Sequence, residues 1–229
     1  MTYEEVIKNL KKESNPRNVA GMARFGINPK KTLGVSVPFL RKLAKETRKS
    51  HSAKAPRDLH QLAQKLWQSN IHEARILASM IDVPNLVTDA QMDKWASEFD
   101  SWDVCDQVCM NLFDKTPYAF NKAKKWTEKM GEFHKRAGFA LMACLAWHDK
   151  TSPNSKFEKF FPFIKKESID ERNFVKKAVN WALRQIGKRN KNLKKKAIEV
   201  AKEIQSIDSK SAKWIVKDAL KELAEKKVN

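Results

Sequence analysis

Apolar residues recur along the chain at helical spacing, in segments separated by short polar stretches. No stretch alternates apolar and polar residues for long, as a half-buried strand would. Glycine occurs only 6 times, and the 8 prolines are expected between the periodic segments rather than inside them. The pattern therefore predicts an all-α protein.

The first 56 residues are expected to form N-terminal helices. A first amphipathic helix is predicted from Tyr3 to Lys12, and a second from Asn15-Pro16 through Arg24. Ser36 is expected to cap a third helix, with Pro38 in its first turn. Each of these starts pairs a capping side chain or a proline with an apolar period that follows it.

A polar linker from Lys49 to Pro56 separates these helices from a modular region at residues 57–229. In that region predicted helices recur in pairs joined by short turns. The expected helices are Leu59–Ser69, one holding Ala74 to Ile81, Met92–Phe99, Trp102–Phe113, Phe120–Met130, Phe133–Trp147, Phe157–Lys166, Phe174–Ile186, Leu193–Gln205 and Lys213–Leu223.

A polar or charged residue stands near the start of each second helix. These residues are Arg75, Asp106, Arg136, Lys177 and Lys213, at intervals of 31, 30, 41 and 36 residues. Paired helices at such a period favour an α-solenoid of HEAT-like repeats, in which neighbouring pairs stack to bury their apolar stripes. We expect one domain over residues 1–229, with the second helices lining a concave basic face. An irregular helical bundle with accidental spacing is the alternative.

The net charge of the chain suggests which class of molecule it binds. Lys and Arg number 46 against 27 Asp and Glu, for a net charge of +19. Such an excess favours a polyanion, above all nucleic acid, although solvated lysine faces would produce the same composition. The opening residues Met1–Val6 are polar and acidic, and the longest apolar run, Ala137–Trp147, is too short to span a bilayer. We therefore expect a cytoplasmic protein that associates with the nucleoid when bound to DNA. A monomer is expected, because one concave groove suffices to embrace a duplex.

The three cysteines are Cys105, Cys109 and Cys144. An odd number without a disulfide framework fits a reducing compartment. Cys105 and Cys109 lie four residues apart, but no second Cys/His pair at ligand spacing accompanies them. We expect small buried side chains rather than a zinc site, and neither a metal nor a cofactor.

The stretch Phe99–Cys109 holds the main candidate site. It reads as the start of a helix, which Ser101 is expected to cap with its hydroxyl. Trp102 and Asp106 are four residues apart and should lie side by side on one helical face. The opposite, buried face is predicted to carry Val104, Val108 and Leu112. A carboxylate beside a large aromatic side chain, on the face away from the core, suits the binding and hydrolysis of a ligand.

If the second helices line one surface, Arg136 and Trp181 should converge there with Trp102 and Asp106. Lys177 and Arg184 flank Trp181 on one helical face and could meet a sugar–phosphate backbone. The remaining tryptophans are expected to be packing residues; they are Trp67, Trp95, Trp126, Trp147 and Trp214.

Taken together, these segments resemble the AlkD-type DNA alkylation repair glycosylases, which are built from HEAT-like repeats. The resemblance is carried by Phe99–Asp106, His134–Ala137 and Phe174–Arg184, and by Gly34–Pro38 followed by Arg41. It extends over nearly the whole chain.

The resemblance implies a role for each matching residue. Asp106 matches the catalytic carboxylate of the family, Trp102 and Trp181 match two tryptophans that cradle the damaged nucleotide, and Arg136 matches an arginine of the same site. It implies base excision repair of cationic N3- and N7-alkylpurines in double-stranded DNA, without enclosure of the base. No lysine stands out as a Schiff-base nucleophile, so a monofunctional enzyme is expected.

Several basic residues are candidate DNA contacts. They are Lys135, Lys177, Arg184, Lys188, Arg75 and Lys213. The run from Lys188 to Lys196 is either a phosphate-contacting or a merely solvated face. A non-catalytic HEAT-like module that binds damaged or branched DNA is the main alternative to the glycosylase, and a scaffold for acidic proteins is a third interpretation.

Overall fold

The computed structural model describes residues 1–51 and 56–225, and within these ranges the regular elements are helices. This confirms the all-α prediction. The described residues form two compact units, Met1–Thr116 and Pro117–Asn229, called here the N-terminal and C-terminal units. Of the expected linker from Lys49 to Pro56, residues 52–55 lie outside the described residues, Lys49 lies within a helix and Pro56 begins the next one.

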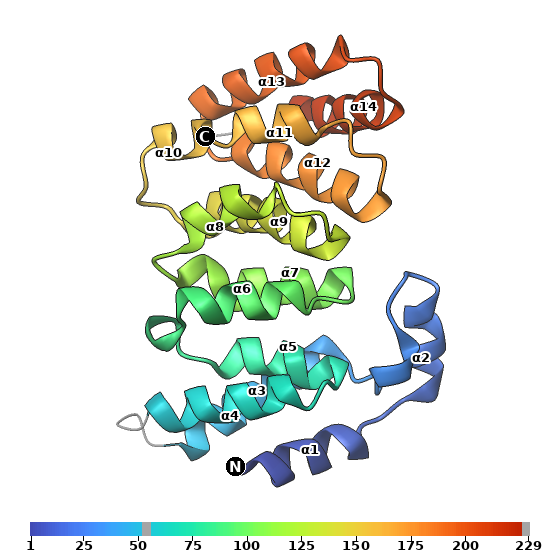
Figure 1. Cartoon of the computed structure of the whole chain (residues 1–229), viewed down its shortest axis with the longest axis vertical. Helices are drawn as coiled ribbons and strands as arrows, with labels where there is room; N and C mark the ends of the chain where they lie inside the picture. Colours follow the sequence, from blue (N-terminus) through green and yellow to red (C-terminus); the bar gives the residue numbers. More distant parts are fainter. Residues whose placement is uncertain (52–55, 226–229) are drawn as a thin grey trace. The chain divides into compact units, whose positions relative to one another are not determined.

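The N-terminal unit contains helices α1 to α7 and three short 3₁₀ turns (Figure 1). Their bounds are α1 Tyr3–Lys12, α2 Pro16–Ala23, η1 Pro29–Lys31, α3 Val37–Ser50, α4 Pro56–Gln68, α5 His72–Ile81, η2 Pro84–Leu86, α6 Asp89–Ser97, α7 Trp102–Asn111 and η3 Phe113–Lys115. Helix α5 is the centre of this unit, since it packs against α3, α4 and α7.

The C-terminal unit contains helices α8 to α14. Their bounds are α8 Ala119–Trp126, α9 Glu132–His148, α10 Asn154–Glu158, α11 Phe161–Glu167, α12 Asn173–Gly187, α13 Lys191–Gln205 and α14 Lys210–Glu225. Helix α9 packs against both α8 and α12, and α12 packs in turn against α13 and α14. Every residue of α9 from Arg136 to Ala146 is buried, which explains the long apolar run of the sequence.

The predicted start of α3 is confirmed by its cap. The Ser36 hydroxyl accepts a hydrogen bond from the backbone N–H of Phe39 at 3.4 Å, and a proline lies in the first turn of α3. The expected helix from Phe157 to Lys166 is wrong, because the chain forms two short helices, α10 and α11, instead. Pro162 causes the break: a proline lacks the N–H of a continuous helix, and its ring would collide with the carbonyl one turn earlier.

Aromatic packing joins successive first helices in the N-terminal unit. The rings of Trp67 in α4 and Trp95 in α6 are stacked, with centroids 4.0 Å apart and planes inclined by 2°. Both indoles are almost fully buried, as is Trp126 in α8 of the other unit. These three tryptophans are packing residues, as predicted. They mark equivalent positions in helices that precede α5, α7 and α9.

Successive second helices run parallel within each unit. In the C-terminal unit, Arg136 near the start of α9 bonds Phe174 near the start of α12, and Ala146 near the end of α9 bonds Arg189 just beyond α12. In the N-terminal unit, His72 and Ser79 of α5 bond Asp103 and Asn111 of α7 in the same order. This repeated arrangement supports the predicted stacking of helix pairs.

Candidate active site

Helix α7 presents the tryptophan–carboxylate pair as predicted. Trp102 and Asp106 are both half-buried and lie one turn apart. The predicted core face is confirmed, because Val104, Val108 and Leu112 have no exposed surface. Cys105 and Cys109 are also fully buried as free thiols, as is Cys144 in α9. In the described parts of the chain, no group of His, Cys, Asp or Glu side chains is arranged to hold a metal ion.

The predicted cap of α7 is wrong in one respect. Ser101 does occupy the N-cap position, with extended backbone angles, but its hydroxyl makes no capping hydrogen bond. The side chain is fully buried, and its oxygen has no hydrogen-bond partner within the described residues. The Ser101 hydroxyl therefore leaves the first amide groups of the helix without a side-chain cap.

The Trp102 indole is anchored to a distant loop. Its Nε1 donates a hydrogen bond to the carbonyl oxygen of Phe25 at 3.0 Å. Phe25 lies just after α2, and 68% of its surface is exposed. The contact joins the start of α7 to a segment 77 residues earlier, so it fixes the direction of the indole plane.

A second anchor for α7 comes from the first residue of α5. His72 Nε2 lies 2.8 Å from Oδ2 of Asp103, and the imidazole is only 5% exposed. Burial lowers the pKa of His72, but the hydrogen bond to Asp103 and the negative charges of Asp103, Glu73 and Asp100 outweigh it and raise the pKa above its ordinary value. The raised pKa favours the charged form of His72 in its hydrogen bond to Asp103, which holds the first turn of α7.

The adjacent residue of α5 holds the Gly34 loop. The buried carboxylate of Glu73 accepts hydrogen bonds from the backbone N–H groups of Leu33, Gly34 and Val35, at distances from 2.6 to 3.2 Å. Neighbouring residues of α5 thus fix both the N-terminal loop and the helix with the candidate carboxylate. No sequence pattern predicted this role of Glu73, because the hydrogen bonds join two segments about 40 positions apart.

Arg75 does not lie where the sequence predicted it. The guanidinium is buried, lies over the Trp67 ring at 4.9 Å, and donates to the Glu98 carbonyl at 3.2 Å. Its Nη1 is also 3.6 Å from the Asp100 carboxylate. These internal contacts occupy the side chain, so the expected DNA contact of Arg75 is corrected to a structural role in the N-terminal unit.

Arg136 is also buried, in the C-terminal unit. Only 6% of its surface is exposed, and Nη1 donates to the carbonyl oxygen of Phe174 at 2.5 Å. The guanidinium therefore links the first turn of α9 to the first turn of α12. Arg136 thereby positions α12, the helix of Trp181, and its assignment to the catalytic site stays a prediction.

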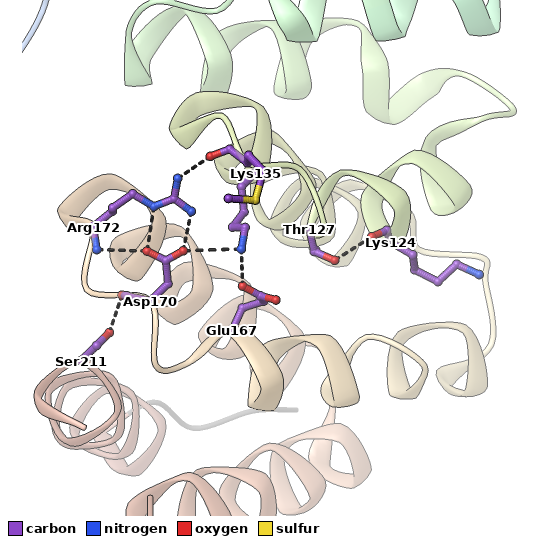
Figure 2. A network of polar contacts seen from close by, with 8 residues as sticks. Lys124, Thr127, Lys135, Glu167, Asp170, Arg172 and Ser211 are labelled. Carbon is purple, nitrogen blue, oxygen red and sulfur yellow. Dashed lines mark hydrogen bonds and ion pairs between the residues drawn. The ribbon is translucent and has the colours of Figure 1, made fainter. Parts of the chain in front are cut away.

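Lys135 belongs to an ion-pair network around the start of α12 (Figure 2). Its Nζ lies 2.5 Å from the carboxylate of Glu167 and 3.6 Å from that of Asp170. Arg172 bonds both carboxylate oxygens of Asp170, at 3.0 and 2.6 Å, and the carbonyl oxygen of Met130 at 2.6 Å. Burial raises the pKa of Asp170, but these hydrogen bonds and charges lower it overall. The charge of Lys135 is thus largely balanced within the protein.

Trp181 is half-buried in the middle of α12. Oriented with its oxygen toward these donors, the Gln185 amide accepts from Trp181 Nε1 at 3.1 Å and from Lys188 Nζ at 3.2 Å. Lys188 also bonds Glu222 of α14 at 2.6 Å, and Arg184 bonds the same carboxylate. Burial raises the pKa of Glu222, but the two cations lower it below its ordinary value.

The remaining basic candidates are exposed. Lys177 lies on α12 with its side chain in solvent, one turn before Trp181. Lys213 is also exposed and lies 2.8 Å from Asp208, a fully solvated pair that water screens strongly. Lys177 is therefore the clearest surface cation beside Trp181.

Two of the tryptophans assigned to packing are in fact exposed. Trp147 is 48% exposed at the end of α9, and Trp214 is 38% exposed on α14. Helical periodicity placed Trp147 at the edge of a continuous apolar run, so it gave no signal of exposure. Across the described residues, no helix combines the length and apolar character needed to cross a bilayer.

The chain is similar to known proteins in sequence and in fold. The sequence model of a family described as "DNA alkylation repair enzyme" matches residues 6–223. A relative from Listeria innocua, "Uncharacterized protein Lin0241", is 24% identical over 209 residues, which are 90% of this chain and 88% of the relative.

A solved structure shows the same fold at low identity. It is described as "A new family of proteins related to the HEAT-like repeat DNA glycosylases with affinity for branched DNA structures". The TM-score is 0.79 at 20% identity, over 96% of this chain and 94% of that chain. The chain therefore has the HEAT-like repeat fold that the helix spacing predicted.

Proposed function

Because this chain belongs to the DNA alkylation repair enzyme family, we propose that it is a DNA glycosylase that removes cationic N3- and N7-alkylated purines. The observation that carries the proposal is the pairing of Trp102 and Asp106 one turn apart on the outer face of α7, with the fully buried Val104 and Val108 on its inner face. Typical products would be free 3-methyladenine and 7-methylguanine.

The chemistry of the lesion matches this pair. An alkylated purine is already positively charged, so its glycosidic bond is weak and the base leaves as a neutral molecule without a general acid. Cleavage builds positive charge on the deoxyribose, as in glycoside hydrolysis. The Asp106 carboxylate would stabilise that charge and orient the attacking water. The face of Trp102, one turn from Asp106 on the same helix, would contribute roughly 0.5–2 kcal/mol through cation–π contact with the sugar.

Arg136 would act by positioning. Its guanidinium is buried between α9 and α12 and donates to Phe174, so it holds the helix that carries Trp181. A direct contact with the lesion nucleotide would need the side chain to leave this bond. We therefore assign Arg136 to the support of α12, and Trp181 to contact with the DNA within the C-terminal unit.

Affinity for the duplex would come from charge. The net charge of +19 favours a polyanion, and each phosphate contact releases counterions. Lys177 would be the strongest single contact beside Trp181, since it is exposed. Lys135, Arg184 and Lys188 would contribute less, because carboxylates of the protein already pair with them. Lys213 is the remaining candidate contact of the C-terminal unit.

The decisive experiment measures base release from DNA that contains 7-methylguanine, with wild type and Asp106→Asn. We expect release by wild type and no detectable release by the variant, while both bind the duplex with similar affinity. Asp58→Asn is the matched control, since it removes the same charge from an exposed position on α4. Release by both wild type and Asp106→Asn would keep the glycosylase and refute the carboxylate mechanism.

A second candidate function is a non-catalytic module that binds branched DNA. It is favoured by the solved relative of the same fold, which is described as having affinity for branched DNA structures. This alternative needs no carboxylate at position 106. Binding without release from either 7-methylguanine or the more labile 3-methyladenine would favour it over the glycosylase.

A further inference from the structure

A polar hollow lies at the C-terminal ends of α9 and α12, within the C-terminal unit. Its volume is about 360 Å³, and its lining residues are Ala146, Trp147, Lys150, Gln185, Lys188 and Arg189. Ligand pockets typically begin near 300 Å³ and combine apolar surface with a few polar groups. The hollow has this character, with one large aromatic side chain among basic and amide groups.

Trp147 is the unusual member of the lining. The preceding residues of α9, from Arg136 to Ala146, are buried, whereas 48% of the Trp147 surface faces solvent. The exposed His148 ring lies beside it, with ring centroids 4.8 Å apart and planes inclined by 30°. A buried helix thus ends in two adjacent exposed rings, those of Trp147 and His148.

The wall behind the two rings is held in place. The Arg189 guanidinium donates to the carbonyl oxygens of Ala146 and Ser152, each at 3.1 Å, and to that of Asp149. The Asp149 carboxylate accepts from the backbone N–H groups of Thr151 and Ser152, at 2.9 and 2.8 Å. Burial raises the pKa of Asp149, but these bonds lower it to about 2, so the turn keeps its charge at neutral pH. The hollow is therefore preorganised.

The cations of the hollow differ in availability. Arg189 is committed to the backbone, and Lys188 shares Glu222 with Arg184. Lys150 is exposed and, among the described residues, has no carboxylate within ion-pair distance. Lys150 is thus positioned to meet an anion next to the Trp147 ring.

Gln185 connects the hollow to Trp181. Its side chain lines the hollow and accepts a hydrogen bond from the indole of Trp181, one helical turn earlier. Trp181 and Trp147 are therefore linked through one side chain within the C-terminal unit.

We propose that this hollow is a subsite for an unstacked nucleotide, whose base stacks on Trp147 and whose phosphate binds Lys150. The inference rests on the proposed DNA-binding function and adds a ligand class, an unpaired nucleotide in the DNA. Flat aromatic side chains flanked by cations bind single-stranded bases irrespective of sequence, because every base has a π-face. A fully paired duplex keeps its bases stacked and cannot offer one to the indole.

The test compares the affinities of a fluorescein-labelled duplex with one unpaired thymidine and of the same duplex fully paired. We expect wild type to bind the bulged duplex more tightly, and Trp147→Ala to weaken that complex roughly tenfold while the paired complex changes little. Trp147→Phe should retain most of the preference. Trp214→Ala is the matched control, since it removes another exposed tryptophan of the same unit.

Three outcomes would overturn the inference: no preference in wild type, an unchanged preference in Trp147→Ala, or an equal loss in Trp214→Ala. Lys150→Glu provides an independent variant at an exposed position and should weaken the bulged complex more than the paired one. Base release and paired-duplex affinity of wild type report on the proposed function separately. If both are intact and the bulge preference is absent, only the subsite is refuted.

Discussion

The indole of Trp102 donates a hydrogen bond to the carbonyl oxygen of Phe25 at 3.0 Å, across 77 residues of sequence. This bond ties the helix of the candidate carboxylate to the loop after α2. Helix α2 itself has no buried residue, so the loop depends on such contacts to keep its place. The orientation of the Trp102 ring therefore depends on both α7 and the loop after α2.

Replacing Trp102 with phenylalanine should remove this donor while keeping an aromatic face. We expect the free energy of unfolding to fall by about 1 kcal/mol, the usual net value of one hydrogen bond, plus a smaller loss of apolar contact. Urea denaturation measures the change. Phe25→Ala keeps the carbonyl acceptor and removes a side chain that is 68% exposed, so its stability should stay within about 0.5 kcal/mol of wild type. A larger loss for Phe25→Ala than for Trp102→Phe would contradict this assignment.

Gly34 should not tolerate a side chain. Its φ is +78°, and a Cβ atom would lie 2.3 Å from the backbone oxygen of Asn15. We expect Gly34→Ala to destabilise the protein by at least about 2 kcal/mol, since the left-handed conformation alone costs 1–2 kcal/mol for other residues. Thermal unfolding tests this expectation.

The control is Gly21→Ala, in helix α2, where a Cβ atom would meet nothing within 4 Å. Alanine favours a helix over glycine by up to about 1 kcal/mol, so this variant should be neutral or slightly more stable. If Gly34→Ala and Gly21→Ala destabilised the protein equally, the conformation of the Gly34 loop would not explain the loss of stability.

The His72–Asp103 pair should make stability depend on pH. Because the folded state raises the pKa of His72 above 6.5, it binds the proton more tightly than the unfolded chain does. This contribution is fully present below pH 6.5 and is lost as the pH rises through the folded pKa. Urea midpoints measured from about pH 5 to pH 8 should therefore decrease over that range.

Asp103→Asn removes the main partner that favours the charged imidazole, leaving the smaller effects of Glu73 and Asp100 against burial. The decrease in midpoint with pH should then flatten. A pH profile unchanged by this substitution would assign the effect to another group.

Lys177 and Lys135 should differ in their contribution to duplex binding. Lys177 is exposed, whereas Lys135 is 12% exposed and lies 2.5 Å from Glu167. Lys177→Ala should lower the slope of log affinity against log salt by about 0.9, the value for one phosphate contact. Lys135→Ala should change the slope less and destabilise the fold instead. Fluorescence anisotropy at several salt concentrations distinguishes these outcomes, and the reverse order would contradict them.

Local patterns were enough to predict the helices and the main pair of the site. The spacing of Val104, Val108 and Leu112 identified the buried face of α7, and the four-residue interval put Trp102 and Asp106 on the other side. Helical geometry depends on neighbours three and four positions away, so a single sequence contains this information. The period of the helix pairs likewise predicted the HEAT-like repeat fold.

Burial of the charged and aromatic residues could not be predicted in this way. Arg75 and Arg136 have the spacing of surface cations, yet each donates to a carbonyl of the following repeat. Trp147 ends an apolar run, yet it is half exposed. Whether such a side chain is covered depends on the neighbouring helix pair, about 30–40 residues away, and no local pattern carries that information.

Local sequence patterns were sufficient to predict that the chain is helical, that its helices recur in pairs, and that an aromatic residue and a carboxylate share one face of α7. The folded chain was needed to show that Phe25 orients Trp102, that Glu73 holds the Gly34 loop, and that Arg136 supports α12. Helix periodicity acts over one turn, whereas each of these hydrogen bonds joins segments between 38 and 77 residues apart.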